Sequence, residues 1–446
     1  MGIETSTVLS EPRERVFAWH ARPGALQRML PPWVPMSVAQ ESGSLADGTA
    51  VVELPGGVKW TAHHRLGDYQ EGHRFVDESE LPLTRSRVPW RHEHLFEDVP
   101  GGTRVIDRIT TPVPSFTVRP ALAYRYRQLS GDFAIAAELR ELAPDPLTIG
   151  MTGSSGLLGS ALAAFLSTAG HRVVRLVRSG AGDTHTRVWD PAAPAEDLAE
   201  GLDAIVHLAG APIAGRFTDK HRRAVHDSRV GPTARLARVA GAVPFISASA
   251  IGLYGADRGD ETLDENASRG DGFLADVVEG WEADAAQATG RHVCVRTGIV
   301  QSAAGGALGL QRPLFAAGLG GPLAGGDQWL SWIALDDMVD IYYRAIVDER
   351  LSGPVNAVAP HPVRQLDWAG QLGRVLRRPA RVPTPGFGPR LLLGADGAKE
   401  VAEASQRVVP ARLAELGHRF RFPLLEGALR HELGKTTDDT IPRATA

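Results

Sequence analysis

The sequence is poor in cysteine and in lysine. Cys294 is the only cysteine among 446 residues, so the chain cannot form an internal disulfide bond. This residue lies in the run HVCVRTGIV, which predicts a buried strand, and we expect an inert core thiol there rather than a nucleophile. Lysine is so scarce that nearly all of the 48 basic residues are arginine. The lysines are Lys59, Lys220, Lys399 and Lys435.

Long apolar runs and a strong net charge are also missing. No stretch of about 18 apolar residues occurs, and the first residues lack the pattern of a signal peptide, so neither a membrane span nor a secretion signal is predicted. A net charge of −4 gives no reason to expect a nucleic-acid partner. With 43% hydrophobic and 22% charged residues, the composition is that of a globular protein. We expect a cytoplasmic protein without a membrane partner.

Residues 1–143 are predicted to form an α+β unit. A helical pattern over 12–30 ends at a proline-rich stretch, and short strand-like runs follow it. Glycine, proline or aspartate bounds most of these runs, as in an antiparallel sheet. A second helical pattern over 124–142 closes the unit, and the sequence APDP after it is a natural linker.

From residue 147 onward, strand and helix patterns alternate. This alternation predicts an α/β fold, with a doubly wound parallel sheet of the Rossmann type. We assign residues 147–390 to this dinucleotide-binding domain. Residues 391–440 are expected to form a small C-terminal domain, with a helical cap over 395–428.

The segment LTIGMTGSSGLLG has the arrangement of a dinucleotide-binding turn. A short apolar run leads into three glycines, and a helical pattern follows at once. Gly153 permits the tight turn, Gly156 lets the backbone approach a pyrophosphate, and Gly159 lets the helix pack on the strand. The free N–H groups at the start of the helix attract the anion.

The end of the second strand distinguishes NAD from NADP. Proteins that bind NAD place an acidic residue there to hold the ribose 2′-hydroxyl, and the run VVRLVRS has none. Arg178 stands at that end, where its planar guanidinium suits a 2′-phosphate. NADP is therefore the expected cofactor and NAD the less favoured one. The alternative interpretation of Arg178 is a solvated charge at a strand end.

Further cofactor contacts are expected where other strands end. Asp190 follows a candidate third strand and is placed to reach the adenine. The run DAIVHLAG ends the fourth strand in a turn of small residues, which would pass under the cofactor. The complete predicted cofactor set is Gly153, Ser154, Ser155, Gly156, Leu157, Leu158, Gly159, Arg178, Ser179, Asp190, Leu208, Ala209, Gly210 and Ser247.

Taken together, several motifs resemble the atypical, epimerase-like branch of the extended short-chain dehydrogenase/reductase superfamily. They are TGSSGLLG, VRLVRS, DAIVHLAGAPI, SASAIGLYG, VRTGIV, GGPLAGGDQWLSWIALDD and GPVNAVAPHPVR, and they cover about residues 147–435 in order. Members are often labelled sugar-nucleotide epimerases. The resemblance implies an NAD(P)-binding epimerase or oxidoreductase whose small C-terminal domain includes SQRVVPARLAELGHRFRFPLLEGAL.

The first 143 residues are similar to a different family. The runs EPRERVFAWHARPGALQRMLPPW and WRHEHLFEDVPGGTRVIDRI resemble the START-like, polyketide-cyclase-type (SRPBCC) helix-grip fold. That resemblance implies a long helix held against a curved sheet, with an apolar cavity between them for a hydrophobic ligand.

The catalytic dyad of the superfamily is missing from this chain. Its chemistry uses a Ser or Thr together with the Tyr and Lys of a Y-x-x-x-K motif. Ser249 falls at the Ser position, but Leu274 and Val278 stand where the Tyr and Lys are expected. A shifted register does not restore the dyad, because none of the six tyrosines has a lysine four residues later. The Glu that follows in the same helix is present as Glu282.

Substitute catalytic groups are Ser249, Tyr254, Asp276 and Glu279. Arg258 is a candidate electrostatic partner of Tyr254, although a Tyr-Gly turn is also a common structural element of this superfamily. Asp276 and Glu279 are three residues apart on one helical face. They either direct both carboxylates at the nicotinamide or form a solvated face.

Three functional interpretations follow, in order of preference. In the first, the chain is an NADP-dependent oxidoreductase or epimerase that acts on an unknown small molecule with substitute catalytic groups. In the second, it binds NADP(H) without chemistry, as a redox-responsive sensor or scaffold. In the third, the N-terminal domain carries the ligand or the activity, and the nucleotide domain regulates it.

Two further groups of residues have both structural and functional interpretations. Trp329 and Trp332 either line a substrate pocket or belong to the core, whereas Asp336 and Asp337 are expected to begin a helix. The N-terminal domain contains a run of histidines, of which His92 and His94 alternate and therefore share one face of a strand. A metal site would need a third ligand close by, and no HExxH or CxxC motif occurs, so no metal is expected. These histidines either form a polar lining of a ligand cavity or are ordinary surface and core residues. The histidine run comprises His63, His64, His73, His92 and His94.

Overall fold

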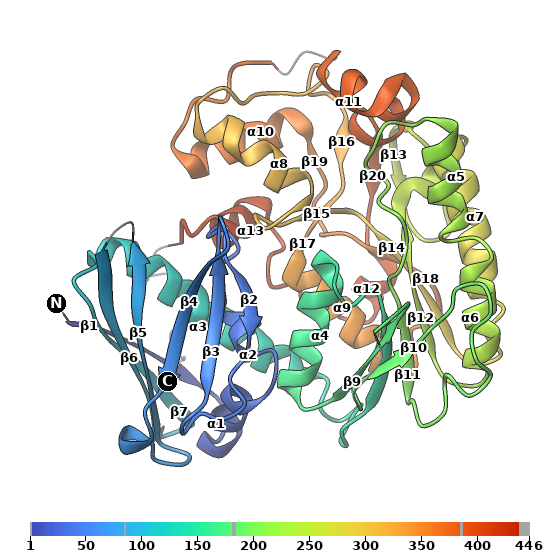
Figure 1. Cartoon of the computed structure of the whole chain (residues 1–446). Helices are drawn as coiled ribbons and strands as arrows, with labels where there is room; N and C mark the ends of the chain where they lie inside the picture. The colour runs from blue at the N-terminus through green and yellow to red at the C-terminus, as the bar shows by residue number, and fades with distance from the viewer. Residues whose placement is uncertain (1, 84–85, 181–183, 384–386, 437–446) are drawn as a thin grey trace. The chain divides into compact units, whose positions relative to one another are not determined.

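The computed structural model describes residues 2–83, 86–180, 184–383 and 387–436. The chain divides into two compact units (Figure 1). Unit 1 comprises Met1–Arg140, Ala164–His171 and Arg430–Ala446, and unit 2 comprises Glu141–Ala163 and Arg172–Leu429. Within the described ranges, no helix has both the length and the apolar content needed to cross a membrane.

Unit 1 contains a seven-stranded antiparallel sheet, so its architecture is α+β as predicted. The strand order is β1-β7-β6-β5-β4-β3-β2. The strands are β1 (Gly2–Leu9), β2 (Ser37–Gln40), β3 (Thr49–Leu54), β4 (Val58–His64), β5 (Arg74–Leu83), β6 (Ser86–Val99) and β7 (Gly102–Thr110). The helices are α1 (Arg13–Ala21), α2 (Ala25–Met29) and α3 (Ser115–Glu138), with a 3-10 turn at Leu66–Asp68.

Two helix predictions in unit 1 need correction. The single helix predicted over 12–30 is interrupted, because Gly24 adopts a left-handed conformation with φ of 95° between α1 and α2. The closing helix begins at Ser115 rather than near residue 124. Pro120 lies inside it as the sixth residue, so the helix lacks the hydrogen bond that a backbone N–H at this position would make to the carbonyl oxygen of Phe116.

Alternation along the strands of unit 1 creates its core. In β7, Val105, Asp107 and Ile109 are buried at alternate positions, and this face is covered by α3. The apolar part gathers around Phe17, with its ring centroid 5.3 Å from that of Phe96. Charged side chains share this interior: Arg28 and Asp132, 4% and 2% exposed, form an ion pair. The inner face of this sheet is therefore only partly apolar.

Unit 2 is built on a seven-stranded parallel sheet, which confirms the predicted Rossmann-type architecture. The order β10-β9-β8-β11-β12-β14-β18 reverses direction between β8 and β11, which is where ligands bind in such sheets. The strands are β8 (Thr148–Thr152), β9 (Arg172–Val177), β10 (Thr186–Val188), β11 (Ala204–His207), β12 (Phe245–Ala250), β14 (His292–Thr297) and β18 (Gly353–Ala357). The helices between them are α4 (Leu157–Ala169), α5 (Asp219–Asp227), α6 (Pro232–Ala240), α7 (Phe273–Ala285) and α9 (Leu335–Val347). The division between the units falls within α4, whose residues from Ala164 onward belong to unit 1.

Smaller elements complete unit 2. Three two-stranded pairs form: β13 (Asp257–Leu263) with β20 (Ser405–Val408), β15 (Ile299–Gln301) with β17 (Trp332–Ala334), and β16 (Trp329–Leu330) with β19 (Val363–Arg364). The segment 395–428 is thus not wholly helical as predicted, because β20 runs through it to pair with β13. The remaining helices are η2 (Ile251–Tyr254), α8 (Gly306–Ala316), α10 (Gln365–Leu376), α11 (Phe387–Gly397), η3 (Ala398–Ala402), α12 (Ala411–Glu415) and α13 (Leu425–Glu432).

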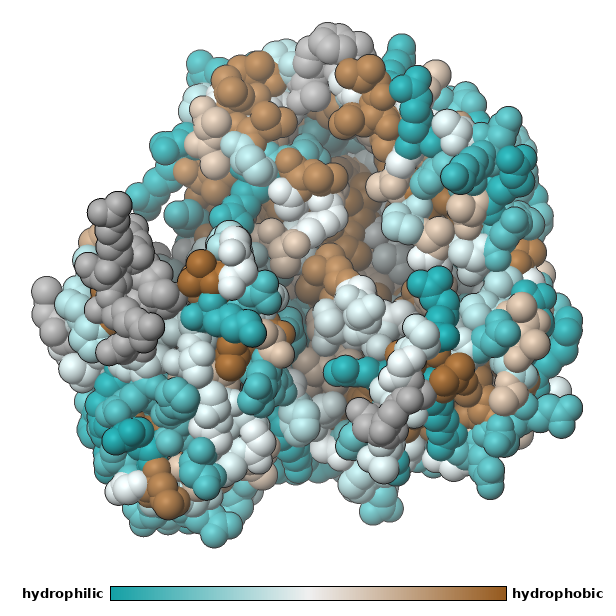
Figure 2. Space-filling view, viewed as in Figure 1, coloured by the Kyte–Doolittle hydropathy of each residue, from teal (hydrophilic) through white to brown (hydrophobic). Residues whose placement is uncertain are grey.

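A hollow is visible in unit 2 (Figure 2). It lies between the region of α8, α10 and α11 and the side of the parallel sheet from which α4 starts, and much of its lining is apolar. Because the carboxyl ends of the parallel strands face this side, side chains that follow those strands are brought to the hollow.

Candidate functional site

The turn between β8 and α4 depends on two glycines. Gly153 has a φ of 67°, and a Cβ atom there would lie 2.7 Å from the carbonyl carbon of Leu208. A Cβ atom on Gly159 would lie 2.1 Å from the carbonyl oxygen of Gly153, which is a severe overlap. Any side chain at either position would force this turn apart, so the helix can start this close to the strand only with glycine.

Gly156 differs from the other two glycines. A Cβ atom there would meet only the Gly153 carbonyl oxygen, at 3.4 Å, and its backbone has no positive φ. Gly156 and Ser155 are exposed, and Ser154, Leu157 and Leu158 are half-buried. The protein itself therefore does not require glycine at position 156, and the absence of a side chain leaves the start of α4 open to a ligand.

The side chain of Thr152 links the turn after β8 to the turn after β11, where the strand order of the sheet reverses. Its hydroxyl oxygen accepts the backbone N–H groups of Leu208 and Ala209 at 3.1 and 3.2 Å. The same hydroxyl lies 2.8 Å from Nδ1 of His207, a buried side chain whose pKa is lowered to about 3 by burial and by Arg229. The predicted residues Leu208 and Ala209 are thus held directly beside Gly153, but sequence reasoning missed Thr152.

Arg229 is a second residue that the sequence analysis missed. It is 7% exposed, lies over the ring of Trp281, and gives an Nη1 hydrogen bond to the carbonyl oxygen of Val225. A Cβ atom on Gly210 would lie 3.0 Å from its Cζ. Its Nε has no hydrogen-bond partner among the described residues, and burial lowers its pKa to about 10. A guanidinium whose Nε makes no hydrogen bond to the described residues thus lies beside Gly210, in the turn that was predicted to contact the cofactor.

The structure places the other predicted cofactor residues in three different settings. Arg178 and Ser179 follow β9 directly and are exposed, and Arg178 forms no ion pair with any described residue. Asp190 is exposed, and its Oδ1 accepts the Ala192 N–H at 2.8 Å, which closes a small turn. Ser247 is fully buried in β12 and its hydroxyl donates to the Ala248 carbonyl oxygen.

Ser249 belongs to a buried polar network. Its hydroxyl donates to Oε1 of Glu282 on α7 at 2.6 Å. Arg296 on β14 holds both oxygens of the same carboxylate, Nε to Oε1 at 2.9 Å and Nη2 to Oε2 at 2.8 Å. This bidentate geometry fixes the carboxylate in one orientation. Glu282 was noted in the sequence only as the remnant of a helix motif, and its partner Arg296 is 14 residues away.

Tyr254 lies in the same network but is fully buried. Its hydroxyl donates to Oδ1 of Asn356 at 2.7 Å and accepts from Nη1 of Arg296 at 2.9 Å. Burial raises its pKa, which the nearby Arg296 partly offsets. The prediction that Arg258 is the electrostatic partner of Tyr254 is wrong. Its guanidinium binds Glu261 and the carbonyl oxygen of Ser268 instead.

The other two candidate carboxylates lie together, as their spacing predicted. The side chains of Asp276 and Glu279 are 68% and 56% exposed, and both pair with the guanidinium of Arg269. The structure does not bring them to Ser249, because α7 presents Glu282 to that hydroxyl instead. Leu274 and Val278, at the positions of the missing dyad, are buried.

The two tryptophans that were predicted to line a pocket or to belong to the core differ in their burial. Trp332 is fully buried, and its Nε1 donates to the carbonyl oxygen of His361. Trp329 is half-buried, and two guanidinium groups lie over its ring, that of Arg364 at 4.0 Å and that of Arg407 at 4.8 Å from the ring centroid. Asp336 and Asp337 lie in the first turn of α9, as predicted.

Comparison with known proteins shows the family of this chain. Residues 149–271 match the NAD dependent epimerase/dehydratase family, and residues 384–432 match a domain of unknown function, DUF1731. An epimerase family protein of Mycobacterium bovis is 39% identical over 290 residues, covering 63% of this chain and 96% of its own. The chain belongs to this epimerase family.

Two solved structures extend the family comparison. The nucleoside-diphosphate sugar epimerase from Corynebacterium glutamicum is 42% identical, with a TM-score of 0.85, and the match covers 97% of this chain and 90% of that one. Human epimerase family protein SDR39U1, solved with NADPH, is 29% identical, with a TM-score of 0.59. That match covers 64% of this chain and 99% of the human one, whereas the bacterial match extends over both units.

Proposed function

We propose that this epimerase-family chain binds NADPH where β8, β9 and β11 end, with NAD as the less favoured cofactor. The observation that carries the proposal is the open position at Gly156, which lies between two glycines that the fold itself requires. The start of α4 would bind the pyrophosphate, and Arg178 would bind the 2′-phosphate. The human relative's structure with NADPH supports the same cofactor. The cofactor set also includes Ser154, Ser155, Ser179, Asp190, Leu208, Ala209, Gly210 and Ser247.

Titration with NADPH and NADH, followed by nucleotide fluorescence, tests cofactor binding. Gly156→Val should abolish binding of both nucleotides while leaving the fold intact, because position 156 has room for a side chain and no positive φ. Arg178→Gln should weaken NADPH about 10-fold and leave NADH unchanged, since one charge-assisted pair is lost. Gly43→Val, at an open glycine of unit 1, is the control. NADPH binding that survives Gly156→Val contradicts the proposal.

The chemical part of the proposal assigns proton transfer to Ser249 and Glu282. NADPH, when bound, supplies a hydride, and its oxidised form accepts one. In the oxidative direction the substrate hydroxyl gives its proton to Ser249 Oγ, while the Ser249 proton passes to Glu282 Oε1, 2.6 Å away. Reduction of a carbonyl reverses both transfers. Tyr254 serves as a positioning residue for Arg296, and Asp276 and Glu279 take no part because Arg269 holds both.

The substrate class follows from this chemistry. It is a small molecule with a carbonyl or secondary hydroxyl carbon, and the name of the Corynebacterium glutamicum relative makes nucleotide sugars the first compounds to examine. With a substrate in hand, Ser249→Ala and Glu282→Gln should each lower turnover by about 100-fold or more without changing NADPH affinity. Glu279→Gln on the same helix is the matched control. Unchanged turnover in both test variants refutes the assignment.

A catalytically silent NADP(H) sensor or scaffold is the second candidate. Two observations favour it: Leu274 and Val278 replace the dyad, and Ser249 is only 3% exposed. Tight NADPH binding without turnover on any carbonyl or nucleotide-sugar substrate would establish it, and any turnover would exclude it.

For unit 1, the residues that resemble the START-like family lead us to assign a hydrophobic-ligand domain. The seven-stranded antiparallel sheet and the 24-residue helix α3 support this assignment. Titration with an apolar fluorescent probe, which should bind unit 1 at one site per chain, tests it.

A further inference from the structure

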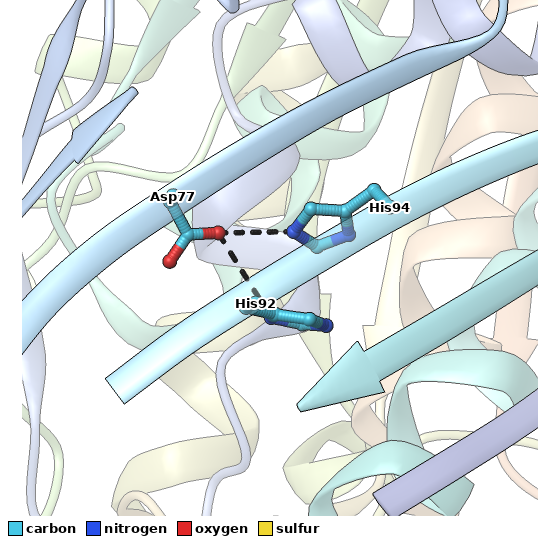
Figure 3. A group of neighbouring side chains, drawn as sticks. All are labelled: Asp77, His92 and His94. Carbon is cyan, nitrogen blue, oxygen red and sulfur yellow. Dashed lines mark hydrogen bonds and ion pairs between the residues drawn. The ribbon is translucent and has the colours of Figure 1, made fainter. Parts of the chain in front are cut away.

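Three side chains of the types that bind metal ions, Asp77, His92 and His94, meet on the inner face of the sheet in unit 1 (Figure 3). Oδ2 of Asp77 lies 3.0 Å from Nε2 of His94 and 3.9 Å from Nδ1 of His92. One ligand atom from each residue lies within 4.8 Å of the other two. Bonds of about 2.0–2.2 Å to a zinc-like ion place neighbouring ligand atoms about 3.3 Å apart, so the separations need only small adjustments to enclose one ion.

Strand register explains why these residues converge. Asp77 on β5 is directly opposite His92 on β6, and opposite residues of an antiparallel pair point to the same side. His94 is two residues further along β6 and therefore shares that face. The missing third ligand of the histidine pair is thus supplied by the neighbouring strand. No spacing within one segment of the sequence could have indicated it.

Asp107 on β7 orients both imidazole rings. Its Oδ1 lies 2.7 Å from Nε2 of His92 and 3.0 Å from Nδ1 of His94, the ring nitrogens that do not face Asp77. This is the arrangement of a metal-binding histidine, whose second nitrogen donates to a carboxylate and thereby fixes the ring. The ring of His94 is also stacked on Phe75, with centroids 4.1 Å apart.

Of the two carboxylates in this group, those of Asp107 and Asp77, only that of Asp107 has an arginine partner among the described residues. Asp107 has its own counter-ion, because Nε of Arg125 donates to its Oδ2 at 3.2 Å. Nη2 of Arg125 lies 2.9 Å from Nε2 of His20 and 3.1 Å from Nδ1 of His94, so it can donate to His20 while His94 donates to Asp107. Asp77 has no arginine or lysine partner among the described residues, and its carboxylate faces only imidazoles.

We propose that Asp77, His92 and His94 bind one divalent transition-metal ion of the zinc class. Two imidazole nitrogens and one carboxylate oxygen favour zinc or a similar borderline ion over magnesium or calcium. Three protein ligands leave at least one coordination position for water or a ligand. The side chains of Asp77 and His92 are 17% and 13% exposed and that of His94 is 5%, so solvent reaches this group mainly at Asp77 and His92.

Cobalt(II) titration of the full-length protein, first freed of metal by dialysis against a chelator, tests the site. We expect one Co²⁺ per chain, seen by its visible absorption bands, and displacement of this ion by one equivalent of Zn²⁺. Asp77→Asn and His92→Gln should each weaken Co²⁺ binding at least about 100-fold, the upper end of the effect seen for residues that only orient ligands. His63→Gln, at an exposed histidine of β4, is the matched control and should bind Co²⁺ normally.

Two results would overturn the proposal. One is wild-type protein that takes up neither Co²⁺ nor Zn²⁺ at 100-fold excess over protein, and the other is undiminished binding in both test variants. Circular dichroism in the presence of chelator shows whether each variant is folded. If Asp77→Asn does not fold, His92→Gln decides, and a rise in the unfolding temperature of wild-type protein on addition of Zn²⁺ is the independent measurement.

Discussion

The two units place their polar chemistry at different points along their strands. In unit 2, β11 is buried at all four positions, and polar side chains such as Thr152 and His207 are the last residues of their strands, β8 and β11. In unit 1, the polar side chains Asp77, His94 and Asp107 lie in the middle of strands, on the face that forms the core. In a parallel sheet that is covered on both faces, functional side chains are found at the strand ends. In an antiparallel sheet with one inner face, they can also lie on that face.

The largest effect is expected at the buried ion pair of unit 1. Asp132→Leu should lower the free energy of unfolding by about 3–5 kcal/mol, because Arg28 would remain buried without its principal counter-ion. The double variant Arg28→Met, Asp132→Leu should recover most of that loss, since no unpaired charge remains. Urea unfolding of the single and double variants measures both changes. If the double variant is no more stable than Asp132→Leu, charge burial is not the cause.

In unit 2 the corresponding prediction concerns the steric overlap that a side chain at position 159 would cause. Gly159→Ala should lower the free energy of unfolding by about 3 kcal/mol, because the new Cβ would overlap the Gly153 carbonyl oxygen at 2.1 Å. Gly156→Ala is the matched control three residues away and should cost less than about 1 kcal/mol. Thermal unfolding distinguishes them. Equal losses would mean that the turn can move and that its glycines are not required by packing.

Acid should weaken unit 2 through His207. Its pKa is lowered to about 3 by burial, with a further contribution from Arg229, against about 6.5 for an exposed histidine. The stability that the neutral ring contributes is complete above pH 6.5 and is lost as the pH falls toward 3, by about 1.4 kcal/mol per unit. His207→Gln should flatten this part of the stability profile, measured by urea unfolding between pH 7 and pH 4. An unchanged slope would assign the acid sensitivity to other groups.

The smallest effect is expected on the exposed face of α7. Glu279→Gln removes one of two carboxylates that Arg269 holds, at a side chain that is 56% exposed. Exposed pairs contribute little, so the free energy of unfolding should change by less than about 0.5 kcal/mol. The same unfolding experiment measures it, and a loss above 1 kcal/mol would show that this face is structurally coupled to the buried network.

The sequence predicted best those features that a short segment determines. The strand, turn and helix at 147–169 were found because three glycines and an apolar run stand side by side. Tyr254 shows the limit: the nearby Arg258 was its expected partner, but Arg296, 42 residues away, binds its hydroxyl. Glu282 was seen but not linked to Ser249, because the two lie on different elements. Asp77 was missed for the same reason, since its role depends on strand register.

If the nucleotide binds as proposed, the burial of Arg229 affects how salt acts on its association. A guanidinium that is 7% exposed is surrounded by protein rather than by salt solution, so mobile ions screen its field weakly. The exposed Arg178 is screened fully. Under the cofactor binding proposed above, raising the ionic strength should weaken the attraction between the nucleotide and Arg178 more than that between the nucleotide and Arg229.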